Sequence, residues 1–234
     1  MGLLNNFLKD KIEEVRFKID RAAKRSGRRF EDIRLIGVTK NVDSKTVIEA
    51  LKLGITDFGE NRVQELIKKA EEVPGANWHL IGRLQTNKVK YILEKVCLIH
   101  SIDRLELAEE INRLAKKLDI TTNVLVQVNI SGEKTKAGIM PESCEDFLLA
   151  LSKHENIKVR GLMTIAPLTD NKEESRQIFA RLYKLFIDMT RKKIHNINME
   201  YLSAGMTNDF DVAIEEGANM VRIGTGLFGS RYIV

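Results

Sequence analysis

The sequence predicts an α/β fold, a single (β/α)8 barrel of the TIM type with an extra helix in front. From residue 33 onward, short β-branched runs alternate with longer amphipathic ones, which is typical of parallel strands joined by crossover helices. The alternation contains eight candidate strands and seven intervening helices, which fit a closed barrel better than an open doubly wound sheet. The length of 234 residues also agrees with such a barrel.

Residues 1–29 are expected to form the extra helix and to pack on the barrel. Leu8, Ile12, Val15 and Ile19 recur at intervals of four and three residues, which places them on one helical face. The segment holds nine Lys and Arg against four Asp and Glu, so it carries the whole net charge of +5. We interpret this charge as a solvated basic face and not as a nucleic-acid site.

The strands and helices are expected in strict alternation. The strands are predicted at 33–39, 55–58, 78–81, 96–100, 124–129, 159–163, 198–202 and 220–223, and the helices at 44–53, 62–72, 86–93, 104–118, 142–153, 172–191 and 208–216. Gly54 and Gly217 suit left-handed C-caps, Pro141 suits a first helical turn, and Thr207 or Asn208 suits an N-cap.

One domain is expected over residues 1–234, because no linker-like composition and no repeat divides the chain. The apolar runs are too short to cross a bilayer, so we expect a soluble cytoplasmic protein with no membrane contact. Cys97 and Cys144 cannot form a disulfide framework, and no Cys/His cluster has the spacing of metal ligands. No metal site is predicted, and the chain is expected to be monomeric.

Lys40 is the first candidate for chemistry. In a barrel of this kind the carboxyl ends of the strands form the functional face. Lys40 ends the first strand run, and strand alternation places it on the same face as Ile36 and Val38. If that face points into the barrel, the amine lies in the mouth, where partial burial beside other cations favours its neutral form. A neutral amine can form a Schiff base with an aldehyde or ketone.

The last two strands end in loops that suit a phosphate. Residues 203–208 join strand seven to a helix, and Gly224, Thr225 and Gly226 follow strand eight. Glycine backbone N–H groups, hydroxyl donors and a helix amino terminus together make a phosphate cradle, and barrels commonly place one at these loops. Turn and capping chemistry is the alternative interpretation. A lysine combined with a cradle indicates a phosphorylated carbonyl compound, and pyridoxal 5'-phosphate (PLP) has both groups.

Arg222 is the candidate partner of the PLP ring nitrogen, where its charge would disfavour protonation of that nitrogen. An ion pair at the barrel rim is the alternative role. His79 and His100 are interpreted as structural or pocket-lining histidines, because no metal-ligand partners accompany them. Glu60 is expected to form a loop ion pair with Arg62.

Several motifs resemble those of the pyridoxal phosphate homeostasis protein family, also called the YggS or proline synthase co-transcribed type. They are GVTK at 37–40, FGENRVQE at 58–65, WHLIGRLQTNK at 78–88, HSID at 100–103, KAG at 136–138, RGLMT at 160–164, LSAGMT at 202–207 and RIGTGLFG at 222–229. The likeness extends from about residue 10 to residue 231. The family is similar to the amino-terminal barrel domain of alanine racemase.

The resemblance implies a Schiff base between PLP and Lys40, with no catalytic residue assigned. The residues expected to bind the cofactor are Lys40, Asn61, Ser203, Gly205, Met206, Thr207, Arg222, Gly224 and Thr225. Lys136 is expected to help in a secondary PLP contact or in transfer. Two positions depart from the family pattern. Asn41-Val42-Asp43 follows the lysine motif, which removes a second lysine from that loop, and Arg83 stands where proline is common.

The expected function is a carrier that holds PLP for intracellular homeostasis, with apo PLP-dependent enzymes as recipients and without turnover. Racemisation needs two bases on opposite faces of the cofactor, and the related racemases take the second from a further domain, for which a chain ending at Val234 leaves no room. A PLP-dependent racemase or lyase acting on an amino acid is the runner-up. A Schiff-base aldolase acting on sugar phosphates, which needs no cofactor, is the third alternative.

Overall fold

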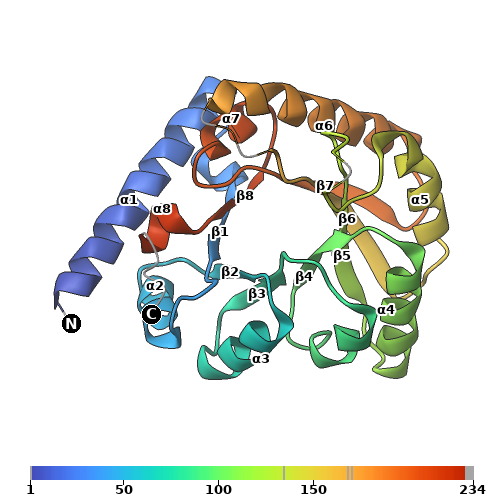
Figure 1. Cartoon of the computed structure of the whole chain (residues 1–234), viewed down its shortest axis with the longest axis horizontal. Coiled ribbons are helices and arrows are strands. Elements are labelled where there is room, and N and C mark those ends of the chain that lie inside the picture. Colours follow the sequence, from blue (N-terminus) through green and yellow to red (C-terminus); the bar gives the residue numbers. More distant parts are fainter. Residues whose placement is uncertain (1, 134, 168, 170, 230–234) are drawn as a thin grey trace.

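The structure, a computed structural model, describes residues 2–133, 135–167, 169 and 171–229, and it confirms the barrel. Eight strands close in the order β1 to β8, and all the pairings are parallel, including that of β8 with β1. Figure 1 shows the strands as an inner ring with the helices outside it. The closed ring places the carboxyl ends of all eight strands at one mouth.

The strands lie close to their predicted positions, with ends that differ by at most two residues. Their bounds are β1 Arg34–Val38, β2 Asp57–Glu60, β3 Asn77–Leu80, β4 Leu98–Ile102, β5 Thr122–Gln127, β6 Ile157–Met163, β7 Ile197–Ser203 and β8 Met220–Ile223. The register shifts between β5 and β6 and between β6 and β7.

The helices are α1 Gly2–Arg25, α2 Ser44–Lys52, α3 Val63–Glu72, α4 Leu105–Lys117, α5 Cys144–Leu151, α6 Lys172–Lys192, α7 Phe210–Glu215 and α8 Thr225–Phe228. One prediction of a helix needs correction, and one helix was missed. The helix expected at 86–93 is a 3-10 segment, Thr86–Tyr91, and the short α8 after β8 was not predicted. The four residues of α8 are too few for a recognisable helical period.

Cap predictions are partly confirmed. Gly54 and Gly217 have φ of +86° and +104°, as left-handed C-caps require. The N-cap of α7 is Asp209 and not Thr207 or Asn208. The Asp209 carboxylate accepts a hydrogen bond from the Met206 backbone N–H at 2.7 Å, which keeps the β7–α7 loop tight. This tight loop delays the start of the helix and leaves Thr207 outside it.

Helix α1 packs along the outside of the barrel against α7 and α8 (Figure 1). Leu8, Ile12, Val15 and Ile19 are all buried, as their spacing predicts. The Arg28 side chain, just beyond the helix, donates hydrogen bonds to three backbone carbonyls at the end of α7. The amino-terminal helix is therefore tied to the same elements that build the loops after β7 and β8.

The apolar side chains inside the barrel form a small cluster of strand residues, namely Ile36, Leu98, Leu125, Met163 and Met220. The larger apolar clusters lie between the strands and the helices. Because this packing closes the barrel interior, a ligand has access only at the mouths. None of the described helices is both long and apolar enough to cross a membrane.

Candidate functional site

A pocket of about 740 Å³ opens at the carboxyl ends of the strands. Its size is within the range of small-molecule sites. It is lined by Val38, Asn61, Ile81, Ile165, Pro167, Thr169, Asn171, Lys172, Glu173, Ser175, Met206, Thr207, Asn208, Asp209, Arg222, Gly224 and Thr225. The pocket thus joins the loops after β1, β2, β3, β6, β7 and β8.

The structure brings most of the predicted site residues to this pocket. Asn61, Met206, Thr207, Arg222, Gly224 and Thr225 line it. Four other predicted residues do not line it, namely Lys40, Ser203, Gly205 and Lys136. Residues from the β6–α6 loop, such as Ile165 and Pro167, also line the pocket and were not predicted, because no charge or glycine pattern marks them.

Lys40 follows β1 by two residues and is partly buried. Alternation along the strand places its side chain on the side of Val38, which lines the pocket. Its ammonium makes no hydrogen bond or ion pair with another residue that the structure describes. The next residue, Asn41, has a φ of 57°, so the chain turns sharply immediately after the lysine.

Glu60 does not pair with Arg62 as predicted. It is fully buried, and its Oε1 accepts hydrogen bonds from Lys69 Nζ at 2.5 Å and from Thr39 Oγ1 at 2.6 Å. Lys69 also donates to the Thr39 carbonyl at 2.6 Å. Arg62 instead lies 3.5 Å from Glu65 on the surface. The buried Glu60–Lys69 pair anchors Thr39, the residue before Lys40, to β2 and α3.

The loops after β7 and β8 meet through Thr207. Its hydroxyl oxygen accepts hydrogen bonds from Thr225 Oγ1 and from the Gly226 backbone N–H, both at 3.2 Å. A Cβ on Gly226 would lie 2.9 Å from Ile223 Cγ2 and 3.2 Å from Thr207 Cγ2, so glycine permits this approach. Because α7 and α8 are short, their helix dipoles add little, and anion binding at these two loops depends mainly on the hydroxyl and peptide donors.

Arg222 is a buried residue, 4% exposed, whose side chain lines the pocket. Its Nη1 donates to Ser203 Oγ at 2.6 Å and its Nη2 to the Thr164 carbonyl at 2.8 Å. Burial lowers the pKa of Arg222 to about 10, opposed by the charge of Asp209. It is not a rim ion pair. Its other N–H donors make no hydrogen bond with any described residue, which suits it to a ligand acceptor.

Ser203 and Gly205 lie behind the pocket wall. The Ser203 hydroxyl is fully buried and contacts Arg222 Nη1 and, at 3.1 Å, His100 Nδ1. The Gly205 carbonyl accepts from the Arg222 backbone N–H, and a Cβ on Gly205 would lie 2.7 Å from Ala213 Cβ. Both residues therefore support Arg222 and the β7–α7 loop, and neither is among the residues that line the pocket.

Lys136 lies in the loop between β5 and α5, outside the pocket wall. Its ammonium is buried, and it lies 3.2 Å from Glu133 Oε1 without the geometry of a hydrogen bond. The loop is folded back by the Asn129 side chain, which donates to the Glu133 carbonyl at 2.9 Å. A buried amine without a hydrogen-bond partner has a strong tendency to find one.

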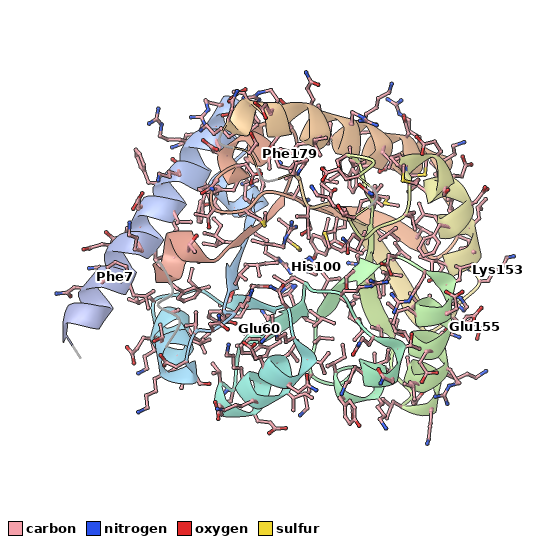
Figure 2. All side chains as sticks on the ribbon, in the orientation of Figure 1. Phe7, Glu60, His100, Lys153, Glu155 and Phe179 are labelled. Atoms are coloured by element: carbon pink, nitrogen blue, oxygen red, sulfur yellow. The ribbon has the colours of Figure 1, made fainter. Side chains whose placement is uncertain are left out.

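The sequence predicts that His79 and His100 are either structural or line the pocket. Both are fully buried, and neither lines the pocket. Figure 2 shows His100 near the centre of the ring of strands. His79 Nδ1 lies 3.1 Å from His100 Nε2, and His79 Nε2 lies 2.9 Å from Asp57 Oδ1. Asp57 had no predicted role, because nothing adjacent in sequence marks it.

Comparison with known proteins supplies the family. The sequence profile described as "Alanine racemase, N-terminal domain" matches residues 12–232. The pyridoxal phosphate homeostasis protein of Aquifex aeolicus is 45% identical over 224 residues, which are 95% of this chain and 97% of that protein. The chain belongs to the pyridoxal phosphate homeostasis protein family. A member from Escherichia coli K12 is 35% identical over 231 residues, 97% of each chain.

Solved structures of the family have the same barrel. PipY of Synechococcus elongatus, described with PLP bound, is 33% identical and has a TM-score of 0.83, covering 95% of this chain and all of its own. An alanine racemase of Clostridium difficile is 22% identical with a TM-score of 0.73, and this chain covers 57% of it. The second likeness concerns the fold of the barrel alone. Membership of this family is what the motifs between residues 10 and 231 predicted.

Proposed function

We propose that this protein binds PLP at the carboxyl end of the barrel and serves in PLP homeostasis. The observation that carries the proposal is one pocket that combines the buried Arg222 with the hydroxyls of Thr207 and Thr225, next to the end of β1, which Lys40 follows by two residues. PipY, a relative of similar length, is described with PLP bound, which supports the same ligand here.

The described residues fit the groups of PLP. Thr207, Thr225 and the peptide N–H groups around Gly224 would bind the phosphate, since Thr207 retains its own hydroxyl proton for an acceptor. Arg222 would donate to the ring nitrogen and disfavour its protonation. PLP supplies the aldehyde, and the Lys40 amine would condense with it as a Schiff base with the loss of one water.

We also propose that the protein carries PLP and does not catalyse a reaction with it. An arginine at the ring nitrogen would disfavour protonation of that nitrogen and so weaken the ring as an electron sink. The names of the relatives at 45% and 35% identity refer to homeostasis and support this role. Chiral analysis after incubation of the PLP-loaded protein with a panel of amino acids tests it, and sustained racemisation would contradict it.

Borohydride reduction followed by intact-mass analysis and peptide mapping tests the binding mode. We expect one adduct with the mass of reduced PLP, located on Lys40. Lys40→Ala should lose the adduct and the yellow colour, whereas Lys45→Ala, which changes an exposed lysine of the same segment, should retain both. Lys136→Ala should leave the primary adduct in place. An adduct on another lysine, or none, would refute the assignment of Lys40.

A further inference from the structure

A line of buried polar side chains crosses the interior of the barrel from Asp57 to Arg222. Asp57 Oδ1 contacts His79 Nε2 at 2.9 Å, and His79 Nδ1 contacts His100 Nε2 at 3.1 Å. His100 Nδ1 then contacts Ser203 Oγ at 3.1 Å, and Ser203 Oγ accepts from Arg222 Nη1 at 2.6 Å. Five strands contribute one residue each, namely β2, β3, β4, β7 and β8.

The two ends of this line are at opposite mouths of the barrel. Asp57 begins β2, and it lines a hollow with Arg34 and Tyr201 at the amino ends of the strands. Arg222 lies near the end of β8, in the pocket proposed for PLP. All five members are at most 8% exposed, so bulk water does not satisfy the groups between the ends.

The protonation states follow from the two ends inward. Although burial opposes the ionisation of Asp57, hydrogen bonds from His79 and Thr56 hold the pKa of its carboxyl below the usual value. The carboxylate can only accept, so His79 Nε2 carries a proton. Burial, followed by the charges of His79 and Arg222, holds the pKa of His100 well below its ordinary value, so His100 is neutral.

The serine fixes the direction of the protons between the two ends. Ser203 Oγ accepts from Arg222 Nη1, and among the described residues the acceptor within reach of its own proton is His100 Nδ1. Ser203 therefore donates to His100 Nδ1, and the neutral His100 carries its proton on Nε2. That proton points to His79 Nδ1, 3.1 Å away, which accepts it.

We propose that Asp57, His79, His100 and Ser203 form a one-directional hydrogen-bond relay that positions Arg222 against the ring nitrogen of PLP. The inference rests on the proposed function. Every donor in the line points from the cationic end toward the carboxylate: Arg222 to Ser203, Ser203 to His100, His100 to His79, and His79 to Asp57. The aligned dipoles stabilise both charges, and Ser203, as an acceptor, orients one edge of the guanidinium.

Nuclear magnetic resonance of the cofactor-free protein tests the order of the protons. With four histidines in the chain, selective ¹⁵N labelling resolves each ring, and His195, which is exposed, serves as an internal reference. We expect His79 and His100 both to carry one proton, on Nε2. A proton on His100 Nδ1, or a doubly protonated His79, would reverse the direction of the line and overturn the relay.

Variants connect the relay with the cofactor. Ser203→Ala removes the acceptor of Arg222, and we expect a shifted absorption spectrum of bound PLP and about tenfold weaker binding, the size of one lost charge-assisted hydrogen bond. Ser203→Thr keeps the hydroxyl and should restore both. Asp57→Asn should change the His79 ring signals and shift the same spectrum. Asp119→Asn, at an exposed position with φ of 55° that asparagine tolerates, should change neither.

The two proposals fail in different ways. If the wild-type protein forms no borohydride adduct, PLP binding at Lys40 is refuted. The protonation of the histidine rings in the cofactor-free protein would then still show whether the relay exists. If the adduct forms but Ser203→Ala and Asp57→Asn leave the PLP spectrum at its wild-type position, the relay is refuted. Should Asp57→Asn not fold, the histidine signals of the wild-type protein and the Ser203 pair of variants decide the question.

Discussion

The Lys69 ammonium lies 2.5 Å from Glu60 Oε1, and the side chains of both residues are almost completely buried. Lys69 also donates to the carbonyl of Thr39, which directly precedes Lys40. The ion pair therefore holds the end of β1 against β2 and α3. Since the turn at Asn41 follows at once, this pair determines where the chain leaves the strand and hence where the Lys40 side chain begins.

Removal of one partner from this pair is expected to destabilise the protein strongly. Lys69→Met leaves the Glu60 carboxylate buried and unpaired, and we expect a loss of about 3–5 kcal/mol in the free energy of unfolding. The double variant Glu60→Gln/Lys69→Met should recover part of the loss. Urea denaturation measures both. Lys68→Met, at an exposed position of the same helix, should lower the free energy of unfolding by less than about 1 kcal/mol. If Lys69→Met loses no more stability than Lys68→Met, the buried ion pair seen in the structure is contradicted.

Stability should fall in mild acid because of His100. Its pKa is held well below the usual 6.5 in the folded protein, chiefly by burial, while the unfolded chain binds the proton normally. Below about pH 6.5 the unfolded state therefore binds more protons, and the free energy of unfolding decreases by up to about 1.4 kcal/mol per pH unit from this residue.

The slope with pH isolates this contribution. Urea denaturation between about pH 7.5 and 5.5 should show a shallower decline for His100→Gln than for the wild type, whatever the absolute stability of the variant. His195→Gln, which changes an exposed histidine, should keep the wild-type slope. Identical slopes in all three proteins would mean that His100 titrates normally in the folded state.

Phosphate recognition should depend on Thr207. Thr207→Val keeps the shape of the side chain but removes the hydroxyl that joins Thr225 and Gly226. We expect PLP to bind at least about tenfold more weakly, since a hydrogen bond to a charged group contributes about 1.5–3 kcal/mol. Titration with pyridoxal, which lacks the phosphate, is the matched ligand control and should show little change. Thr121→Val, at an exposed position, should bind both ligands normally.

The contact between Gly82 and Asn61 should be intolerant of a side chain. A Cβ on Gly82 would lie 2.3 Å from the Asn61 carbonyl oxygen and 2.7 Å from Asn61 Cα. Gly82→Ala must therefore displace Asn61, which lines the pocket, at an expected cost of about 1–3 kcal/mol. Thermal unfolding and PLP titration measure the two effects.

Gly75→Ala provides the comparison for Gly82→Ala. Gly75 has a φ of +85°, but a Cβ there would meet nothing within 4 Å. Its substitution should show the strain of the backbone alone, about 1 kcal/mol, without weaker PLP binding. If Gly82→Ala binds PLP as Gly75→Ala does, the position of Asn61 is unimportant for the ligand.

Much of the candidate site could be predicted, because the carboxyl ends of barrel strands converge whatever their side chains are. This rule located Asn61, Thr207, Arg222, Gly224 and Thr225, all of which line one pocket. The rule gives no orientation for the side chain of a residue at a strand end. Ser203 ends β7, but its hydroxyl faces Arg222 and His100 inside the barrel.

The period of apolar residues along the chain was sufficient to specify eight strands, all but one of the crossover helices and the buried face of α1, since these depend on contacts close in sequence. The partners of the buried polar side chains were decided only by the tertiary packing. Glu60 pairs with Lys69 of the following helix and not with the adjacent Arg62, and His100 meets Ser203 although 103 residues separate them. Such pairs arise because the packing of helices on strands, and of strands around the ring, brings these groups together, and desolvation in the interior then leaves each polar group only the partner within reach.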